Sequence, residues 1–297
     1  MTSIHEFTTD FRSLLDKKRF EEQTIDGQSG FYDKTEQVFV PENVFANLFS
    51  NIGPKYQPSD TEIQRMINTS SKRVSTTLKD TYKNSKDSYA QIFLSYLSHK
   101  FLIENQNHPR NMVILYIDLV GSTALTAILN PAELSMIIRI FCQEISICIS
   151  RYFGYVLKYA GDAVIGFFPE VSTFSRENLY EHAIKCAFYM GKLLDESINE
   201  ILFQNGYPKL KSRIAIDAGE NQIIILGSEP DLLGHVISRA AKIMSKATPN
   251  NIIIGDNVFK YLNDSIKVKF PIKDKFMLFE TGEIYPIYIS NKKNIKF

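Results

Sequence analysis

Hydrophobic positions change their spacing before the middle of the chain. Up to residue 108, apolar side chains recur every three or four positions, most clearly from Asp60 to about Asn105, as on one face of a helix. This spacing predicts a mainly helical N-terminal region, residues 1–108, with a regulatory or dimerising role. Within that region, the apolar segment Gln37–Pro41 is compatible with a strand or with a docking loop.

A mixed pattern of strands and helices begins after His108 and Pro109. Hydrophobic runs predict helices at 131–152, 176–203 and 231–247. They predict strands at 113–118, 154–159, 163–168, 212–217, 221–226, 252–254, 266–270, 275–280 and 284–289. Asn130, Pro131 and Glu133 form a helix start with a capping box. The order strand, helix, hairpin, helix, strand is that of a ferredoxin-like, palm-type α/β (α+β) sandwich, which we expect to cover residues 109–292.

Composition and charge narrow the class of protein. The chain has 297 residues, of which 44% are hydrophobic, enough for a sizeable core with an accessory region. Its formal net charge is +1, which argues against general nucleic-acid binding but leaves a phosphorylated small molecule open. No run reaches the roughly 18 apolar residues of a membrane span, and we expect a cytoplasmic protein. Cys142, Cys148 and Cys186 are expected to be buried free thiols.

An apolar strand ends directly in an acid, Asp118. Side chains alternate along a strand, so Tyr116 and Asp118 share one face and lie roughly 7 Å apart along it. A small turn with Gly121, Ser122 and Thr123 follows the acid. Asp118 could cap this turn through the hydroxyl residues, or it could bind a cation at the edge of the sheet.

A second acid, Asp162, occupies the tip of the predicted hairpin, next to a glycine. A hairpin beside the first strand can bring Asp162 close to Asp118, and two carboxylates that face one point must share a proton or bind a cation. Mg²⁺ suits such a site, since it prefers oxygen ligands and leaves positions open for phosphate. Two such ions would activate a hydroxyl nucleophile, while the backbone amides from Leu119 to Thr123 would cradle phosphate oxygens.

Three segments of the C-terminal part, taken in order, resemble the signatures of the class III nucleotidyl cyclases. They are Ile117–Thr123, Lys158–Asp162 and Gly234–Ile243. The segment Arg213–Glu220 also resembles the strand and turn that precede the family's last motif. The resemblance covers about residues 109–290, and the occurrence of all three motifs in order makes it specific.

The resemblance implies an enzyme that converts a nucleoside triphosphate to a 3′,5′-cyclic nucleotide and pyrophosphate. Asp118 and Asp162 would hold two Mg²⁺ or Mn²⁺ ions, with the carbonyl of Leu119 as a further ligand, in an active site shared across a homodimer. Lys158 and Asp231 match the positions that contact adenine in adenylate cyclases, which favours ATP as the substrate. Asp231 is equally suited to cap the helix that follows it.

The third motif departs from the family at two positions. Ser238 stands where the family has an asparagine that orients the ribose, and Lys242 where it has an arginine that stabilises charge on the α-phosphate. They are four residues apart and so share one helix face. Lysine keeps the positive charge but loses the bidentate fork. The loss of one well-placed donor costs about 10²- to 10³-fold in rate, and the neighbouring Arg239 ranks below Lys242 as an alternative donor.

Two further residues bear on the substrate. Tyr116 replaces the phenylalanine that is common in adenylate cyclases, and in this respect the chain resembles the pyrimidine cyclases of bacterial antiphage signalling. UTP or CTP is therefore an alternative to ATP. Lys275 lies near the place where the family has a triphosphate-binding lysine. The departures at Ser238 and Lys242 leave a further alternative, a catalytically weak cyclase-like module that binds a nucleotide.

Overall fold

The chain divides into two compact units, residues 1–55 and 56–297. The computed structural model describes residues 15, 17–25, 27–35, 37–42, 59–79, 88–170, 176–278 and 282–290. Within these ranges, no helix combines the length and the apolar character that a membrane crossing requires.

The described part of the first unit is a small antiparallel sheet, in the order β1-β2-β3. Its strands are β1 (Phe20–Ile25), β2 (Gln28–Asp33) and β3 (Val38–Pro41). Gly27 has a φ of 76°, which favours glycine and allows the tight turn between β1 and β2. The expectation of a mainly helical region is wrong for this segment, because polar residues alternate with apolar ones there, and Gln37–Pro41 contributes a strand.

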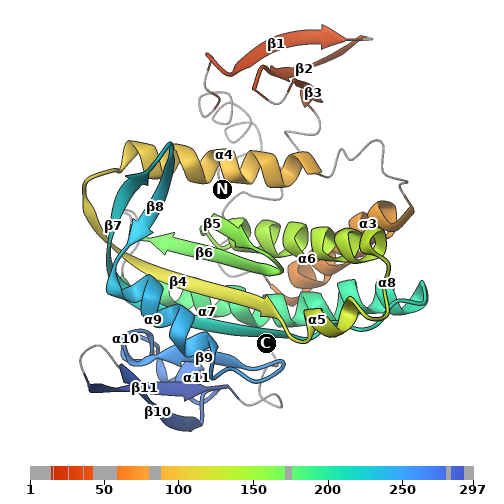
Figure 1. Ribbon diagram of the computed structural model, residues 1–297. Helices are drawn as coiled ribbons and strands as arrows, with labels where there is room; N and C mark the ends of the chain where they lie inside the picture. Colours follow the sequence, from red (N-terminus) through yellow and green to blue (C-terminus); the bar gives the residue numbers. More distant parts are fainter. Residues whose placement is uncertain are drawn as a thin grey trace. The chain divides into compact units, whose positions relative to one another are not determined.

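The second unit is built on a mixed eight-stranded sheet in the order β10-β11-β9-β7-β4-β6-β5, with β8 paired to β7 (Figure 1). Its strands are β4 (Pro109–Leu119), β5 (Tyr155–Ala160), β6 (Ala163–Pro169), β7 (Ser212–Leu226), β8 (Glu229–Leu233), β9 (Ile252–Gly255), β10 (Ile272–Leu278) and β11 (Glu283–Ile289). The sub-order β7-β4-β6-β5 is that of a ferredoxin-like sandwich, so this prediction is confirmed.

Helices cover both faces of this sheet (Figure 1). The helical elements are α3 (Asp60–Lys79), α4 (Ser88–Glu104), α5 (Ser122–Leu125), α6 (Pro131–Arg151), α7 (Arg176–Leu193), the π-helical turn η1 (Leu194–Ile198), α8 (Asn199–Gln204), α9 (His235–Met244), α10 (Asp256–Phe259) and α11 (Asp264–Lys267). The predicted capping box is present, since Asn130 accepts from the amide of Glu133 and the Glu133 carboxylate accepts from that of Asn130.

Strand β4 lies at the centre of the sheet and separates two regions of the core. Val113, Leu115 and Ile117 belong to the large cluster formed with α6 and α7. Ile114 and Tyr116 point the other way, toward a smaller cluster that contains residues of α9. The predicted alternation is therefore confirmed, and the face that carries Tyr116 and Asp118 is the one opposite α6 and α7.

Within the second unit, helix α3 packs on α6 and the π-helical turn through polar contacts as well as apolar ones. Arg73 donates two hydrogen bonds to Glu144 of α6, from Nε to Oε1 at 2.8 Å and from Nη2 to Oε2 at 2.6 Å. The hydroxyl of Ser71 lies 3.1 Å from that of Ser197 in the π-helical turn. The expected helices are thus confirmed for α3 and α4, although both belong to the second unit. The domain boundary at residue 108 remains a prediction.

Strand β7 corrects one expectation, because residues 212–226 form one continuous strand and not a pair. Gly219, between the two predicted strands, lies inside the continuous strand and has a φ of 151°, a value that favours glycine. A Cβ there would lie 2.9 Å from Cγ2 of Val236 in α9. The glycine therefore permits a close approach of the strand to α9.

Two further elements differ from the sequence prediction. The helix expected at 231–247 begins only at His235, because residues 229–233 form β8 and pair with the end of β7. Asp231 therefore does not cap a helix. The strand expected at 266–270 is wrong, since Asn263 caps α11 by accepting a hydrogen bond from the amide of Ile266 at 3.0 Å.

Candidate active site

Asp118 lies near the end of β4, directly opposite Arg213 in the register of β4 and β7. The guanidinium of Arg213 donates to Oδ2 of Asp118 from Nη2 at 2.7 Å and from Nε at 3.0 Å. Both side chains are partly exposed, at 18% for Asp118 and 33% for Arg213. Among the described residues no hydrogen bond reaches the other oxygen of Asp118, so this carboxylate keeps a coordination position.

Asp162 lies at the tip of the β5–β6 hairpin, where Gly161 has a φ of 65° and closes the turn. The last paired residues of β4 and β6 are Ile117 and Val164. Asp118 is one residue beyond this pair and Asp162 is two residues before it, so adjacent strands carry the two acids to one edge. Asp118 thus lies near a strand end and Asp162 at a hairpin turn, and their common metal site stays a prediction.

One oxygen of Asp162 is buried without a hydrogen-bond donor. Oδ2 has no partner in the part of the chain that the structure describes. Burial, together with the charge of Asp162, raises the pKa of the Cys142 thiol in α6 to about 12, which places this carboxylate close to α6. A buried, unpaired carboxylate oxygen is costly unless a cation or proton satisfies it.

The two acids therefore fit a divalent cation through the oxygens that protein donors leave open. No cluster of three or more His, Cys, Asp or Glu side chains suitable for a metal occurs within the described ranges. Two carboxylates with a main-chain carbonyl, such as that of Leu119, are a sufficient protein contribution for Mg²⁺, which retains waters and binds substrate phosphates. The charge of Arg213 balances that of Asp118.

A second group of polar residues meets on the exposed part of the sheet. Nζ of Lys158 on β5 lies 2.6 Å from Oδ2 of Asp231 on β8, although 73 residues separate them in sequence. Tyr116 of β4 is close to the same carboxylate, since burial and the charge of Asp231 raise the pKa of its hydroxyl. The structure thus brings together all three residues that the sequence linked to base recognition.

Helix α9 presents Ser238 on an exposed surface and carries Lys242, which is partly buried, one turn later. Arg239 points elsewhere: its Nε donates to Oδ2 of the fully buried Asp217, and its Nη2 donates to the carbonyl of Ala218 at 3.2 Å. This engagement removes Arg239 as an alternative donor to a phosphate. The ranking of Lys242 above Arg239 therefore has a structural reason.

The Asp217 network was not anticipated from the sequence. Oδ1 of Asp217 accepts from the hydroxyl of Tyr285 at 2.8 Å and from the amide of Ala218 at 2.9 Å. The guanidinium of Arg239 also lies over the Tyr285 ring, 4.5 Å from its centroid. Burial raises the pKa of Asp217, and the charge of Arg239 opposes this shift. The network joins β7, α9 and β11 and so fixes the helix that carries Ser238 and Lys242.

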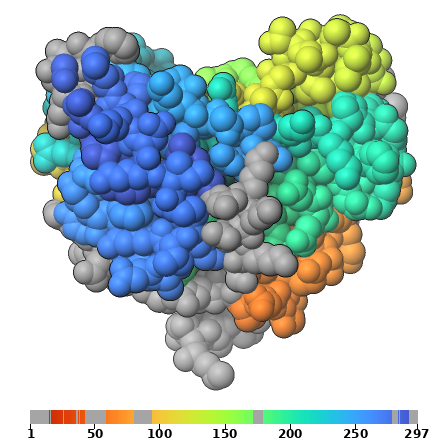
Figure 2. Space-filling view, turned by 90° about the horizontal axis from the view of Figure 1, so that it is seen from below, coloured from red at the N-terminus to blue at the C-terminus, as the bar shows by residue number. Residues whose placement is uncertain are grey.

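The turn after Asp118 leads directly into a short helix. Gly121, with a φ of 78°, is the N-cap of the short helix that starts at Ser122 and Thr123. No side-chain hydrogen bond, from Asp118 or another described residue, caps this helix. The amide of Val120 donates to the carbonyl of Lys211 at 2.7 Å and so is not available to a phosphate. Figure 2 shows the surface hollowed between the α5 segment (yellow) and the C-terminal strands (blue).

Lys275 is exposed on β10, at the far end of the sheet from the hairpin. Strands β11, β9 and β7 separate β10 from β4. Within one chain, Lys275 is therefore not brought together with Asp118 and Asp162, and its role in triphosphate binding remains a prediction.

These features define a palm-type α/β domain with two acids at one edge of a sheet and a separate polar cluster on the same sheet. The profile of the adenylate and guanylate cyclase catalytic domain family matches residues 104–289. Because this match covers more than half of the chain, the protein belongs to that family, the class III nucleotidyl cyclases.

Curated relatives carry two different substrate names. The chain is 24% identical over 184 residues to a cytidylate cyclase of Escherichia coli, a match that covers 58% of this chain and 40% of the relative. It is 25% identical over 170 residues to a cytidylate cyclase of Staphylococcus aureus, covering 55% and 40%. An adenylate cyclase of Anabaena cylindrica is 24% identical over 166 residues, covering 52% and 31%. The matches thus span two fifths or less of these relatives.

Solved structures support the fold. The crystal structure of a guanylyl cyclase aligns with a TM-score of 0.56 and 22% identity, covering 62% of this chain and 92% of the other. The adenylyl cyclase CyaB from P. aeruginosa aligns with a TM-score of 0.54 and 20% identity, covering 62% and 95%. At this identity the likeness shows the cyclase fold and carries no information about the base.

Proposed function

We propose that this protein is a nucleotidyl cyclase that converts CTP to 3′,5′-cyclic CMP and pyrophosphate. The observation that carries the cyclase reaction is the meeting of Asp118 and Asp162 at one edge of the sheet, each with one oxygen not used by a protein donor. In the reaction, the 3′-hydroxyl oxygen forms a bond to the α-phosphorus, the bond from that phosphorus to the bridging oxygen breaks, and pyrophosphate leaves. The hydroxyl proton passes to solvent.

Asp118, Asp162 and the carbonyl of Leu119 would hold two Mg²⁺ or Mn²⁺ ions. Such ions lower the pKa of the attacking hydroxyl and neutralise charge on the triphosphate. Arg213, released from Asp118 by the metal, would be free to contact phosphate oxygens. Ser238 would orient the ribose and Lys242 would offset charge on the α-phosphate, and we propose that a second copy of the chain supplies them.

The Lys158–Asp231 pair supports cytosine or adenine over uracil or guanine. Cytosine and adenine each present an exocyclic amine, a donor, next to an unprotonated ring nitrogen, an acceptor. Asp231 can accept from that amine while Lys158 donates to the ring nitrogen. Uracil and guanine present a carbonyl oxygen at the position of the amine, which would face the Asp231 carboxylate.

Tyr116 supports cytosine over adenine. Burial, and secondly the charge of Asp231, raise the pKa of its hydroxyl, which stays protonated and can donate to a base carbonyl. Cytosine has such a carbonyl on the same ring and adenine has none. The bulk of the tyrosine also leaves less room for a purine. The cytidylate cyclases among the relatives agree with this choice, which replaces the preference for ATP drawn from the sequence.

ATP is the second candidate, because the Lys158–Asp231 pair suits adenine equally well. The 297-residue chain should be incubated with Mn²⁺ and each of the four triphosphates separately, and the cyclic product and pyrophosphate should be measured. We expect product mainly from CTP. Product from ATP in its place would overturn the base assignment, and no product from any triphosphate would favour a nucleotide-binding module without catalysis.

Tyr116→Phe tests the base assignment within an otherwise intact site. The substitution removes the hydroxyl and keeps the ring, so kcat/KM for CTP should fall about 5- to 20-fold, the equivalent of one lost hydrogen bond to the base. Activity with ATP should not fall. An equal loss with both substrates would show that Tyr116 supports the site without reading the base.

A further inference from the structure

The β5–β6 hairpin carries two residues of the proposed active site, and both precede its inner strand β6. Lys158 lies on β5 and Asp162 at the turn. Among the described strands, β5 is at the edge of the sheet and pairs with β6 alone. The register between them shifts at Val156 and Lys158, which marks a bulge that bends the strand and redirects its side chains. A side-chain contact from β5 to a neighbouring helix would therefore add to the support that β6 gives the hairpin tip.

Tyr159, between Lys158 and the turn, ties the hairpin to helix α6. Its hydroxyl lies 2.9 Å from the hydroxyl of Ser146. Ser146 donates its own hydrogen to the carbonyl of Cys142 at 2.6 Å, so Tyr159 must be the donor to Ser146. Ser146 is fully buried, so a partner lost there leaves a polar group that bulk solvent does not reach.

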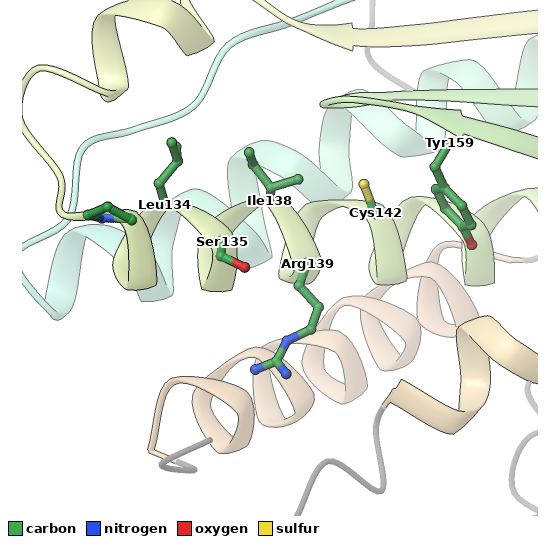
Figure 3. A pocket seen from close by; sticks show the side chains of 7 residues that line it. Leu134, Ser135, Ile138, Arg139, Cys142 and Tyr159 are labelled. Atoms are coloured by element: carbon green, nitrogen blue, oxygen red, sulfur yellow. The ribbon is translucent and has the colours of Figure 1, made fainter. Parts of the chain in front are cut away.

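Packing alone leaves the Tyr159 ring room to move. Figure 3 shows the ring reaching from its strand toward α6, near Cys142. Tyr159 and Cys142 line one end of an open groove of about 490 Å³, which continues along α6 past Ile138 and Leu134. The ring therefore has an unfilled space on one side, and its hydroxyl bond selects one position.

Helix α6 is itself held firmly, so it can act as the reference for the hairpin. Glu144, two residues before Ser146, is 98% buried, with only 2% of its side chain exposed, and forms the two-bond ion pair with Arg73 of α3. A bidentate pair of this kind fixes geometry as well as charge. The path from α3 to the hairpin tip thus runs through Glu144, Ser146 and Tyr159.

We infer that Tyr159 is a positioning residue, which sets the place of Asp162 and Lys158 through its hydrogen bond to Ser146. This inference rests on the proposed function for the roles of those two residues. It assigns to Tyr159 no contact with substrate or metal, because its side chain points to α6 and away from the exposed Lys158.

The test compares Tyr159→Phe and Ser146→Ala with the wild type in binding of Mn²⁺ alone, followed by the electron paramagnetic resonance signal of free Mn²⁺. Loss of the bond should raise the Mn²⁺ dissociation constant about 3- to 10-fold, the equivalent of one hydrogen bond. The double variant should be no weaker than the weaker single variant, since both remove the same bond. If the wild type is active, the Mn²⁺ concentration for half-maximal rate should be higher in both variants than in the wild type, by the same factor.

Tyr288→Phe is the matched control. It removes the bond from the Tyr288 hydroxyl to Asp256, at 3.1 Å, in a part of the fold away from the hairpin. It should lower thermal stability about as much as Tyr159→Phe and leave Mn²⁺ binding unchanged. Unchanged Mn²⁺ binding in both Tyr159→Phe and Ser146→Ala, or an equal loss in Tyr288→Phe, would overturn the inference.

The two proposals can fail separately. A wild type that binds Mn²⁺ but makes no cyclic nucleotide would contradict the proposed function, while the Mn²⁺ titrations would still decide the role of Tyr159. If Tyr159→Phe fails to fold, Ser146→Ala gives the same comparison, because it removes the acceptor and leaves the tyrosine ring in place.

Discussion

Strand β7 carries two charged residues on one face, Arg213 and Asp217, and each forms a carboxylate–guanidinium pair of a different kind. In the Asp118–Arg213 pair both side chains are partly exposed, and one oxygen of Asp118 receives both hydrogen bonds. In the Asp217–Arg239 pair the acid is fully buried, and donors from Arg239, Tyr285 and Ala218 meet both of its oxygens.

The difference distinguishes a carboxylate that can bind a ligand from one that stabilises the fold. A carboxylate whose oxygens are all engaged in a dry interior cannot take a metal or a substrate without losing its partners. A carboxylate with an open oxygen at the edge of the sheet can exchange its partner for a cation. The same pair of residue types thus serves the fold at Asp217 and the proposed chemistry at Asp118.

Asp118→Asn should produce the largest effect, and it should be an effect on activity. Removing a charged residue from the proposed metal site would forfeit several kcal/mol of transition-state stabilisation, so cyclic nucleotide formation should fall by about 10³-fold or more. Stability should change by about 1 kcal/mol or less, because the ion pair is partly exposed at the edge of the sheet. Rate measurements and urea denaturation check both values. Asp264→Asn, at a fully exposed acid, is the control and should change neither.

Asp217→Ala should instead act on stability. It leaves the Arg239 guanidinium with no counter-charge in a largely buried position, and the free energy of unfolding should fall by about 3–5 kcal/mol. Urea denaturation measures this loss. Adding Arg239→Met to the variant should restore at least half of it, because the unpaired charge is gone. Exposed ion pairs contribute about 1 kcal/mol or less. A free energy of unfolding of Asp217→Ala within about 1 kcal/mol of the wild type would therefore contradict a structural role for this pair.

Acid pH should destabilise the fold through one buried histidine. His182 of α7 is 95% buried, with 5% of its side chain exposed, against Phe153; burial, and secondly Lys185, lower its pKa from 6.5 to about 4. The unfolded chain therefore binds a proton more readily between these values, and stability should fall as the pH drops from about 6.5 toward 4, by up to about 3 kcal/mol. Unfolding curves measured across this range should flatten in His182→Gln. An unchanged slope in that variant would assign the pH dependence to other groups.

Gly255→Ala should give the smallest of these effects, through the same buried network. A Cβ at Gly255 would lie 2.4 Å from Oδ1 of Asp217 and 2.7 Å from the Tyr285 hydroxyl, so stability should fall by about 1–3 kcal/mol. Gly191→Ala is the matched control, because a Cβ there meets no atom within 4 Å. In helix α7 the control should be neutral or stabilising by about 0.5–1 kcal/mol. Equal thermal shifts in the two variants would show that Gly255 is not confined by Asp217.

Much of the fold could be predicted from local patterns in the sequence. The capping box at Asn130, the hairpin turn at Gly161 and the alternation of side chains along β4 depend on neighbours in sequence, and the structure has all three. The two acids could be placed at one edge for the same reason, since a strand end and a hairpin tip are local features.

Features that depend on distant partners were missed. The pairing of Arg213 with Asp118 follows from the register of β4 and β7, which no local pattern specifies. Strand β8 was taken for the start of a helix because its pairing partner lies earlier in the chain. The buried contacts of Asp217 and of Ser146 form only when separate elements pack, and small polar residues within apolar runs are the only signal that the sequence gives of them.

The most direct test of the account is a competition among substrates. Wild-type protein and Asp118→Asn should be incubated with Mn²⁺ and an equimolar mixture of ATP, GTP, CTP and UTP, and the cyclic products should be separated by mass. The account predicts cyclic CMP as the main product of the wild type and no cyclic product above background from Asp118→Asn. A purine cyclic nucleotide as the main product would contradict the assignment of the base to Tyr116, Lys158 and Asp231, and equal activity of the two proteins would contradict the metal site.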